Sequence, residues 1–356
     1  MYIYIIMVII SLLFAYLAEK NKMKKIFNVY KILSIIPFVV VSAIRFDVGT
    51  DYMYRYAPDF EMIRLGGQVK NLEIGFKIII HICIFIFNNY ESLFAITTLI
   101  TIPIIMNIIF KYSKKITLSI FLFFAGCYFF HSLNALRQYI AISIMLLAYK
   151  NILDNSYKKF IILFLLAFFI HYTSIVCIIA IFLRKKIITT PIVVAILVSI
   201  ILVLANPLNE LVDLLIANSY YSIYTDSIYN TSDLNNSALV LNIIVYILLY
   251  SGAKKQKIEE VNKMTFFINM QGMALIFVTM GAITSLFFRI AFYFSILQII
   301  SIPYVLYNTV TTKETKWKKI YLLIIILLFL ANITYNNVIN NVDGVLPYKT
   351  IFNKYN

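Results

Sequence analysis

Charged residues are scarce in this chain of 356 residues. Asp, Glu, Lys and Arg make up 13% of it and only 16 residues are acidic, whereas 62% are hydrophobic. Soluble domains are about half apolar and about a quarter charged. The composition therefore excludes a soluble globular protein and predicts an integral membrane protein that crosses the bilayer several times.

Cysteine is nearly as scarce. Cys83, Cys127 and Cys177 each lie inside an apolar run, and none belongs to a C-x-x-C pair. A disulfide framework needs an even set of cysteines, and a zinc site needs a characteristic ligand spacing. We therefore expect neither, and we assign these cysteines to packing. The sequence also lacks a strong carboxylate cluster for a metal ion, so we expect no metal and no cofactor.

A cleavage site is also missing near the start of the chain. The first apolar run, residues 2–18, has no basic residue ahead of it and no small-residue cleavage site behind it. A lysine-rich stretch, residues 19–25, follows directly. This pattern predicts a retained membrane anchor and not a cleaved signal peptide.

Long apolar runs occur along most of the chain. A bilayer-spanning helix takes roughly 17 to 25 residues. We predict spans near residues 2–18, 26–44, 91–110, 116–133, 134–150, 188–205, 238–252, 263–283, 285–308 and 318–336. Two further runs, 73–87 and 160–183, are ambiguous. Without an internal repeat or a soluble domain boundary, residues 1–356 are expected to form one all-α transmembrane domain with about 11–13 transmembrane or half-spanning helices.

The distribution of lysine predicts how these helices are oriented. The formal charge is +15, but the lysines mostly form short clusters beside the apolar runs, which indicates topology and not nucleic-acid binding. Placing these clusters in the cytoplasm puts the loops near 45–72 and 206–237 outside. Simple counting of spans then fails near 73–110 and 160–183. One consistent solution, which we take as a hypothesis, makes run 73–87 interfacial or re-entrant and breaks run 160–183 near His171. Such a break is allowed only where it is buried or lines a wet cavity.

Arginine is rare in this chain, and several arginines lie at the ends of predicted helices. Only six arginines occur, and Arg45, Arg137 and Arg289 each lie at the outer end of a different predicted helix. A charge at membrane depth costs roughly 2.5 to 3.5 kcal/mol. Two explanations remain open: snorkelling or ion pairing, as between Arg45 and Asp47 or Asp51, and binding of an anionic ligand such as a lipid pyrophosphate, which a guanidinium grips at two points.

Other polar residues could carry chemistry. Asp47 and Asp51 lie four residues apart around Gly49, so one could pair with an arginine while the other accepts a proton from a hydroxyl. His171 could be a general base, a donor to phosphate or a satisfied interhelical histidine. Glu73 begins an ambiguous run and could be a helix N-terminal charge, which favours the helix dipole and needs no chemistry.

Four separated segments form a pattern. Residues 45–52 read R-F-D-V-G-T-D-Y, residues 73–76 read E-I-G-F, residues 134–141 read N-A-L-R-Q-Y-I-A, and residues 169–174 read F-I-H-Y-T-S. In this order they resemble motifs of the EpsG/Wzy-type polysaccharide polymerase family, with Ile74 standing where that family has proline.

The resemblance implies a bacterial enzyme similar to the C-type membrane glycosyltransferases. Its donor would be an oligosaccharide on undecaprenyl pyrophosphate, transferred at the outer face of the cytoplasmic membrane to a hydroxyl of a second lipid-linked unit. A flippase and a chain-length regulator are the implied partners. The residues that we assign from the motifs and from topology are, for catalysis, Asp47, Asp51 and His171, and, for substrate binding, Arg45, Tyr52, Asn134, Arg137, Gln138 and Arg289.

Two other functions also suit a many-helix protein with arginines at its outer side. A transporter or flippase of lipid-linked sugars would need gating symmetry, for which the sequence supplies no repeat pair. A membrane O-acetyltransferase would need polar groups near the cytoplasmic face, whereas here they gather on the predicted outer side.

Overall fold

The structure is a computed structural model that describes residues 1–184, 236–253, 261–308 and 313–354. Within these ranges all regular secondary structure is helical, which confirms the all-α prediction. The β-type pairing found there is an isolated antiparallel bridge between Arg45 and Thr350.

The chain forms two compact units. Unit 1 contains Met1–Asn151, Tyr157–Ile175 and Leu330–Asn356, and unit 2 contains Ile152–Ser156 and Val176–Phe329. The single-domain organisation stays a prediction. Every motif of the sequence pattern belongs to unit 1, whereas Arg289 belongs to unit 2.

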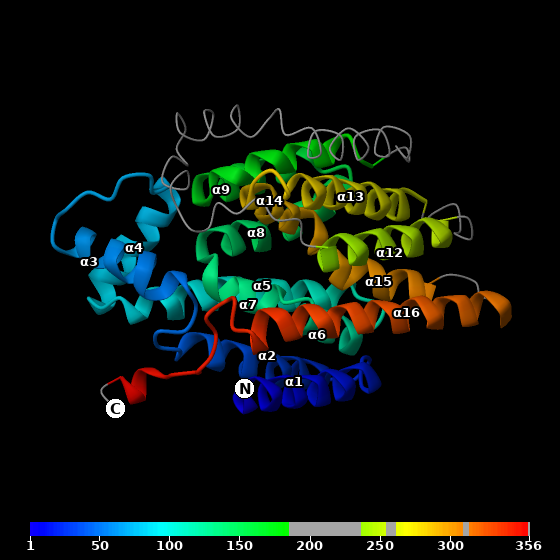
Figure 1. Ribbon diagram of the computed structural model, residues 1–356, viewed down its shortest axis with the longest axis horizontal. Coiled ribbons are helices and arrows are strands. Elements are labelled where there is room, and N and C mark those ends of the chain that lie inside the picture. Colours follow the sequence, from blue (N-terminus) through cyan, green and yellow to red (C-terminus); the bar gives the residue numbers. More distant parts are fainter. Residues whose placement is uncertain (185–235, 254–260, 309–312, 355–356) are drawn as a thin grey trace. The chain divides into compact units, whose positions relative to one another are not determined.

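The helices of unit 1 follow the chain order in Figure 1. They are α1 (Tyr2–Lys20), α2 (Phe27–Ala43), the π-helix η1 (Tyr52–Tyr56), α3 (Ala57–Arg64), α4 (Ile74–Phe87), α5 (Glu91–Tyr112), α6 (Ile116–Ala125), α7 (Tyr128–Asn134), α8 (Leu136–Leu153), α9 (Tyr157–Ile170), η5 (Tyr335–Ile339) and η6 (Ile351–Asn353). The last two residues of α8 belong to unit 2.

Unit 2 contains the remaining described helices. These are η2 (Tyr172–Ile181), α12 (Asn236–Ala253), α13 (Val261–Met280), α14 (Ser285–Ser295), α15 (Gln298–Asn308) and α16 (Lys313–Thr334). The 3-10 helix η2 begins in unit 1, and α16 ends there.

The predicted spans are recovered as helices wherever the structure describes them. Among the described residues, α1, α5 and most of α13 are long and apolar enough to cross a membrane, and the number rises from 3 to 5 if two bent pairs each form one span. These pairs, α6–α7 and α14–α15, bend by 51° and 43°. The predicted span 188–205 lies outside the described residues. These apolar helices are consistent with a multi-pass membrane protein.

The two ambiguous apolar runs, 73–87 and 160–183, form different structures. Run 160–183 breaks as predicted: α9 ends at Ile170 and η2 starts at Tyr172, with His171 between them. Run 73–87 forms α4, whose 14 residues fall short of the roughly 20 needed to cross a bilayer. Its interfacial or re-entrant placement stays a prediction.

Small hydroxyl residues hold the first two helices together. α1 and α2 lie side by side (Figure 1), and Ser11 and Ser34 each donate a hydrogen bond to the other's backbone carbonyl, at 2.6 and 2.9 Å. Small residues allow two helix backbones to approach closely where lipid offers no hydrophobic drive for association. Tyr4 connects α1 to α7 instead, because its ring packs edge-on against those of Phe129 and Phe130.

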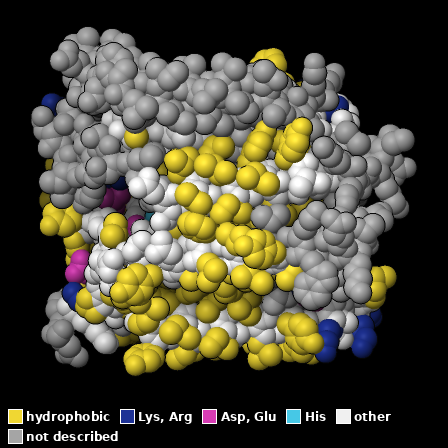
Figure 2. Space-filling model, turned by 45° about the vertical axis from the view of Figure 1, so that its right-hand side comes forward, with side chains coloured by type: hydrophobic (Ala, Val, Ile, Leu, Met, Phe, Trp, Pro, Cys, Tyr) yellow, Lys and Arg dark blue, Asp and Glu magenta, His cyan; other side chains and the backbone are white. Residues whose placement is uncertain are grey.

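Apolar side chains cover much of the surface. Figure 2 shows hydrophobic side chains spread over the face that it displays, with lysine and arginine gathered at its lower right edge. On α1 the exposed apolar residues include Ile6, Ile9 and Leu13. A soluble protein rarely exposes contiguous apolar area of this kind, so lipid is the solvent that suits these faces.

Candidate functional site

The loop after α2 brings the first motif against the third. Asp47 and Gly49 have positive φ angles of 51° and 102°. A Cβ at residue 49 would lie 2.7 Å from the Asn134 side-chain oxygen, so only glycine fits this approach. Thr50 donates to that same oxygen at 3.2 Å. The predicted bend at Gly49 is thus present, and it seats the loop on the end of α7.

A C-terminal segment that no sequence motif marked holds this loop in place. We call residues 343–351 the C-terminal strap. The amide nitrogens of Phe46 and Gly49 donate to the carbonyls of Lys349 and Gly344 at 3.0 and 2.9 Å, and Asn134 donates to the Asp343 carbonyl at 2.9 Å. The strap therefore ties the ends of α2 and α7 to the loop through backbone carbonyls.

Arg45 is buried beneath the loop, with 1% of its surface exposed. Its guanidinium donates to the carbonyls of Ser42 and Leu133 and lies 5.1 Å from the centre of the Phe94 ring. In the part of the chain that the structure describes, carbonyls and an aromatic face hold Arg45, not a carboxylate. These contacts fit a structural tie between α2, α5 and α7, and a role in substrate binding stays a prediction.

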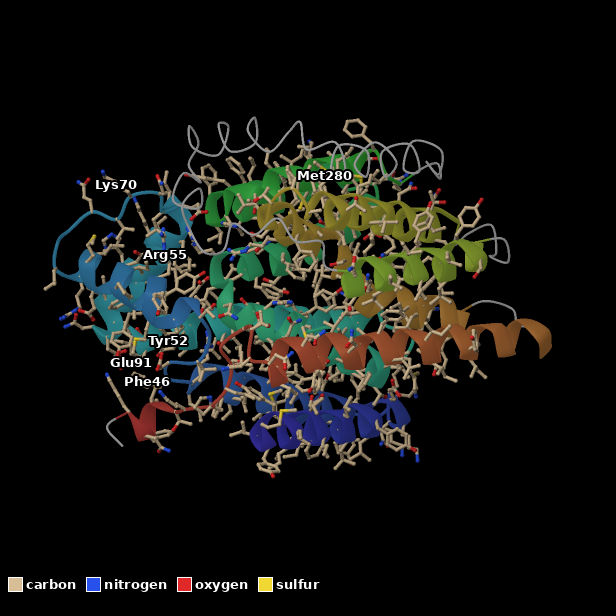
Figure 3. All side chains as sticks on the ribbon, in the orientation of Figure 1. Phe46, Tyr52, Arg55, Lys70, Glu91 and Met280 are labelled. Carbon is tan, nitrogen blue, oxygen red and sulfur yellow. The ribbon has the colours of Figure 1, made fainter. Side chains whose placement is uncertain are left out.

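The other predicted residues of this loop have different surroundings. Asp47 pairs with Lys349 at 3.1 Å on the surface. Asp51 precedes η1. Tyr52 is fully buried and stacks flat on Phe94 at 3.6 Å, and Figure 3 shows it beside Phe46 and Glu91. The tyrosine therefore packs the loop onto α5. The predicted roles of Asp47, Asp51 and Tyr52 in the reaction stay predictions.

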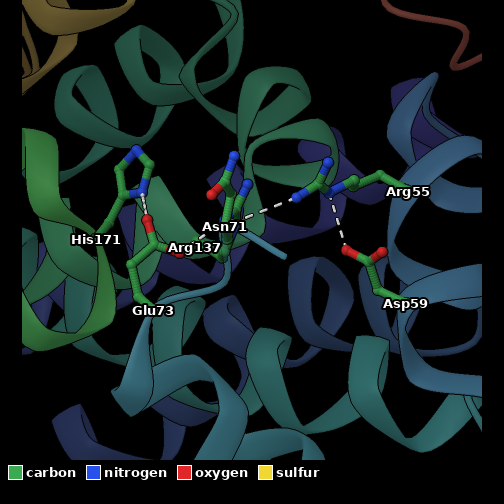
Figure 4. A network of polar contacts seen from close by, with 6 residues as sticks. All are labelled: Arg55, Asp59, Asn71, Glu73, Arg137 and His171. Carbon is green, nitrogen blue, oxygen red and sulfur yellow. Dashed lines mark hydrogen bonds and ion pairs between the residues drawn. The ribbon is translucent and has the colours of Figure 1, made fainter. Parts of the chain in front are cut away.

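Three residues from distant parts of the sequence meet at a buried cluster. Glu73 precedes α4, Arg137 lies on the first turn of α8, and His171 occupies the break between α9 and η2. A Glu73 oxygen accepts from Arg137 Nη1 at 2.6 Å, and its other oxygen lies 2.7 Å from His171 Nδ1 (Figure 4). We call these three residues the Glu–Arg–His cluster.

Gly75 lets α4 approach closely enough to form this cluster. A Cβ at residue 75 would lie 2.8 Å from the Phe169 carbonyl oxygen on α9. That separation is shorter than real Cβ contacts allow, so a larger residue would push the helices apart. The glycine of the second motif thus places Glu73 within reach of His171 in the fourth.

The Glu73 carboxyl is ionised in this setting. Burial raises its pKa, but the hydrogen bond with His171 and the charge of Arg137 outweigh burial and lower that pKa to about 2. An ionised carboxylate can only accept hydrogen bonds, so the proton between the two residues belongs to His171 Nδ1. This fixes the tautomer of a neutral His171 and leaves Nε2 as its basic nitrogen.

Glu73 lies at the N-terminus of α4, as predicted, and its contacts go beyond those of a helix N-terminal charge. Glu73 does precede the first residue of α4, but its side chain makes no capping hydrogen bond to that helix. It is completely buried, and both of its oxygens bind the other two members of the cluster. The signal was present in the sequence, because Glu73 begins the second of the four motifs.

A second ion pair lies next to the cluster. Arg55 on η1 and Asp59 on α3 are 2.8 Å apart, and Arg55 also donates to the Asn71 carbonyl at 3.5 Å (Figure 4). Asn71, two residues before Glu73, has a positive φ of 56°. Neither Arg55 nor Asp59 was among the predicted site residues.

The remaining predicted residues are divided between the two units. Gln138 is buried on α8 directly after Arg137. Arg289 is half-buried on α14 in unit 2, just after the predicted turn at 281–285. Its pairing with Arg137 at one ligand stays a prediction.

Comparison with known proteins identifies the family of this chain. No curated protein and no solved structure matches the chain. The sequence model of the EpsG family, in contrast, matches residues 28–350, a range that includes all four motifs and the whole Glu–Arg–His cluster. Because this match covers most of the chain, and as the motifs predicted, the protein belongs to the EpsG family.

Proposed function

We propose that this protein is a membrane glycosyltransferase that joins lipid-linked oligosaccharide repeat units into a surface polysaccharide. Membership of the EpsG family links it to exopolysaccharide biosynthesis. The proposed donor is an undecaprenyl-pyrophosphate-linked glycan at the outer face of a bacterial cytoplasmic membrane, with a flippase and a chain-length regulator as partners. The observation that carries the proposal is the Glu–Arg–His cluster, in which three separate motifs converge.

The chemistry of this transfer needs a base. The acceptor hydroxyl attacks the anomeric carbon of the donor, and its proton must leave as the new bond forms. We assign that proton to Nε2 of His171, which points away from Glu73 in Figure 4. Glu73 holds the ring through Nδ1 and stabilises the imidazolium that forms, as a carboxylate does for the histidine of a hydrolase triad.

The leaving group needs positive charge. As the bond to the anomeric carbon breaks, the pyrophosphate gains negative charge, and a buried guanidinium stabilises such charge well. Arg137 is 8% exposed and fixed by Glu73, so its charge is already in position. In this proposal Arg137→Lys abolishes chain growth, because an ammonium is a point charge that does not reproduce the planar fork. Arg289 is the second proposed pyrophosphate residue.

Glycan profiles of cells lacking the gene test this function. The cells are complemented with wild type, His171→Ala or the control His81→Ala, which changes an exposed histidine on α4, and their lipid-linked intermediates are extracted. We expect His171→Ala to lose polymer and to accumulate single repeat units on the outer side of the membrane, and His81→Ala to retain polymer.

Two results would contradict the proposal. Repeat units trapped on the inner side would identify a flippase, and a full-length polymer lacking only a substituent would identify an acyltransferase. Protein levels in the membrane fraction must match between the variants for the comparison to count.

A further inference from the structure

The ion pair of Arg55 and Asp59 differs in exposure from the neighbouring pair of Glu61 and Arg64 on α3. The Arg55 and Asp59 side chains are 25% and 15% exposed, whereas those of Arg64 and Glu61, a few residues on, are 36% and 34% exposed. The Arg55 pair is therefore partly withdrawn from water yet still open at its arginine end. An ion pair in this position keeps its charges available to a ligand while limiting their screening.

The pair lies within electrostatic reach of the Glu–Arg–His cluster. Arg55 donates to the carbonyl of Asn71, in the turn that leads to Glu73. Burial raises the pKa of the Asp59 carboxyl, while Arg55 and then Arg137 act to lower it. Two guanidinium groups thus act on one carboxylate, and Figure 4 shows the Arg55–Asp59 pair beside the Glu–Arg–His cluster.

The local backbone holds Arg55 on a rigid element. Residues 52–56 form a π-helix that runs directly into α3, and such π-turns often occur at functional sites. Tyr56, next to Arg55, is buried and its ring lies 5.8 Å from that of Phe76 on α4. Asp59, four residues after Arg55, lies on the same helix face. Packing therefore holds the backbone that carries Arg55, and the ion pair with Asp59 orients its guanidinium.

The charges of the network balance before any ligand binds. Arg55 and Arg137 carry two positive charges, and Asp59 and Glu73 carry two negative ones. Glu73 is completely buried and bound by two partners, so it stays with Arg137. Asp59 has weaker ties, and its pKa is raised. An incoming anion would therefore replace Asp59 in the network more readily than Glu73.

We propose that Arg55 is a further anion-binding residue of this site, beside those already named, which binds a diphosphate group together with Arg137, and that Asp59 is the counter-ion that holds Arg55 until the ligand replaces it. This inference rests on the proposed function, since it names the part of the lipid-linked donor that the site recognises. It extends the site to the external loop, where the sequence had indicated only Arg45, Asp47, Asp51 and Tyr52.

The proposal makes Arg55 and Asp59 act in opposite directions on ligand affinity. Removing Arg55 takes away a guanidinium that grips phosphate at two points. Removing the charge of Asp59 removes the carboxylate that competes with the ligand for the Arg55 guanidinium. A purely structural ion pair gives no such sign difference, because breaking it from either side has the same consequence.

The experiment measures binding of inorganic pyrophosphate to the purified full-length protein in detergent by calorimetry. We expect Arg55→Ala to weaken binding about tenfold or more, Arg55→Lys to weaken it less, and Asp59→Asn to tighten it several-fold. Arg64→Ala is the matched control, because it breaks an exposed pair on the same helix, and it should leave the affinity unchanged. Melting temperatures of all variants verify that they are folded.

A second ligand distinguishes the source of the diphosphate. The same series measured with undecaprenyl pyrophosphate in nanodiscs should show the same order of affinities if the site recognises the lipid-linked group. The proposal is overturned if Arg55→Lys and Asp59→Asn shift affinity in the same direction, if neither shifts it, or if wild type binds neither ligand.

Binding and glycan profiles together separate the role of Arg55 from the polymerase function. If His171→Ala cells lose polymer but Arg55 variants bind pyrophosphate normally, the polymerase proposal stands and the role of Arg55 is wrong. If the Arg55 and Asp59 variants shift affinity in opposite directions while cells lacking the gene keep normal polymer, the anion site stands and the polymerase proposal is wrong.

Discussion

At the scale of residues, Glu73 is the centre of the site. It has no exposed surface and accepts hydrogen bonds from two cationic or potentially cationic groups. Removing one member of a buried charged pair typically costs about 3 to 5 kcal/mol, because the remaining charge is left without a partner. Glu73 is therefore expected to matter both for the stability of unit 1 and for the orientation of His171.

Glu73→Gln should reduce polymer formation by about 10²- to 10⁴-fold. The amide is nearly isosteric, but it cannot stabilise an imidazolium, and it can present the wrong group to His171 Nδ1. The measurement is the amount of polymer made by membranes supplied with lipid-linked repeat units. Glu61→Gln, which changes an exposed carboxylate in the same unit, is the control. Normal polymer from Glu73→Gln would remove Glu73 from the mechanism.

The lowered pKa of Glu73 also predicts how stability depends on pH. The folded-state pKa of about 2 lies below the ordinary value of 4.5, so ionised Glu73 stabilises the fold fully above pH 4.5, and this contribution is lost as the pH falls toward 2. Melting temperatures of the detergent-solubilised protein should therefore fall more steeply in this window for wild type than for Glu73→Gln. Parallel curves for the two proteins would contradict the assignment.

At the scale of elements, close contact between α4 and α9 assembles the cluster. Gly75 faces the carbonyl of Phe169, and the adjacent Ile74 is exposed. The same two helices supply Glu73 at the start of one and His171 at the end of the other. A small change in their separation should therefore act directly on the distance between the carboxylate and the imidazole.

Gly75→Ala should weaken both the fold and the activity. Overpacking of this kind costs about 1 to 3 kcal/mol, and here the obstacle is backbone that cannot move aside as a side chain would. We expect a lower melting temperature and less polymer, whereas Ile74→Ala should be close to wild type in both. Equal behaviour of the two variants would show that the helices are free to separate.

The C-terminal strap is the second element on which the site depends. It is bonded to the backbone of the 45–51 loop by the amides of Phe46, Gly49 and Thr50. Ending the chain before Asp343 should make these three amides exchange with solvent at least about tenfold faster, since their acceptors are gone. Hydrogen exchange of the detergent-solubilised protein measures this. Phe352→Ala, an exposed change beyond the strap, should leave them protected.

At the scale of the whole molecule, the sequence that matches the EpsG family model runs through both compact units. The match to residues 28–350 covers most of unit 1 and all of unit 2, so the family resemblance is not confined to the cluster. Many apolar side chains are exposed on the helices. The polar groups that could take part in a reaction are buried or lie in the 45–72 loop. This division is expected where lipid surrounds the helices and the reaction takes place at a wet surface.

Several features of this molecule were predictable from local sequence. The helices α1, α2 and α5 match their predicted runs closely, because the length of an apolar run is set by the thickness of the bilayer. The break at His171 followed from keeping the lysine clusters on one side, and the structure confirms it. The bends at α6–α7 and α14–α15 were missed, because hydropathy does not register a change of direction within an apolar run.

Hydrophobic length, charge distribution and short motifs were enough to predict a helical protein of the membrane type, its family and the break at His171. Which polar groups meet depends instead on the tertiary structure. Glu73 lies 64 residues from Arg137 and 98 from His171, and the strap reaches loop residues about 300 positions earlier, as in the contact of Lys349 with Asp47, which spans 302. Such contacts arise from how helices pack in three dimensions, which no local pattern of residues records.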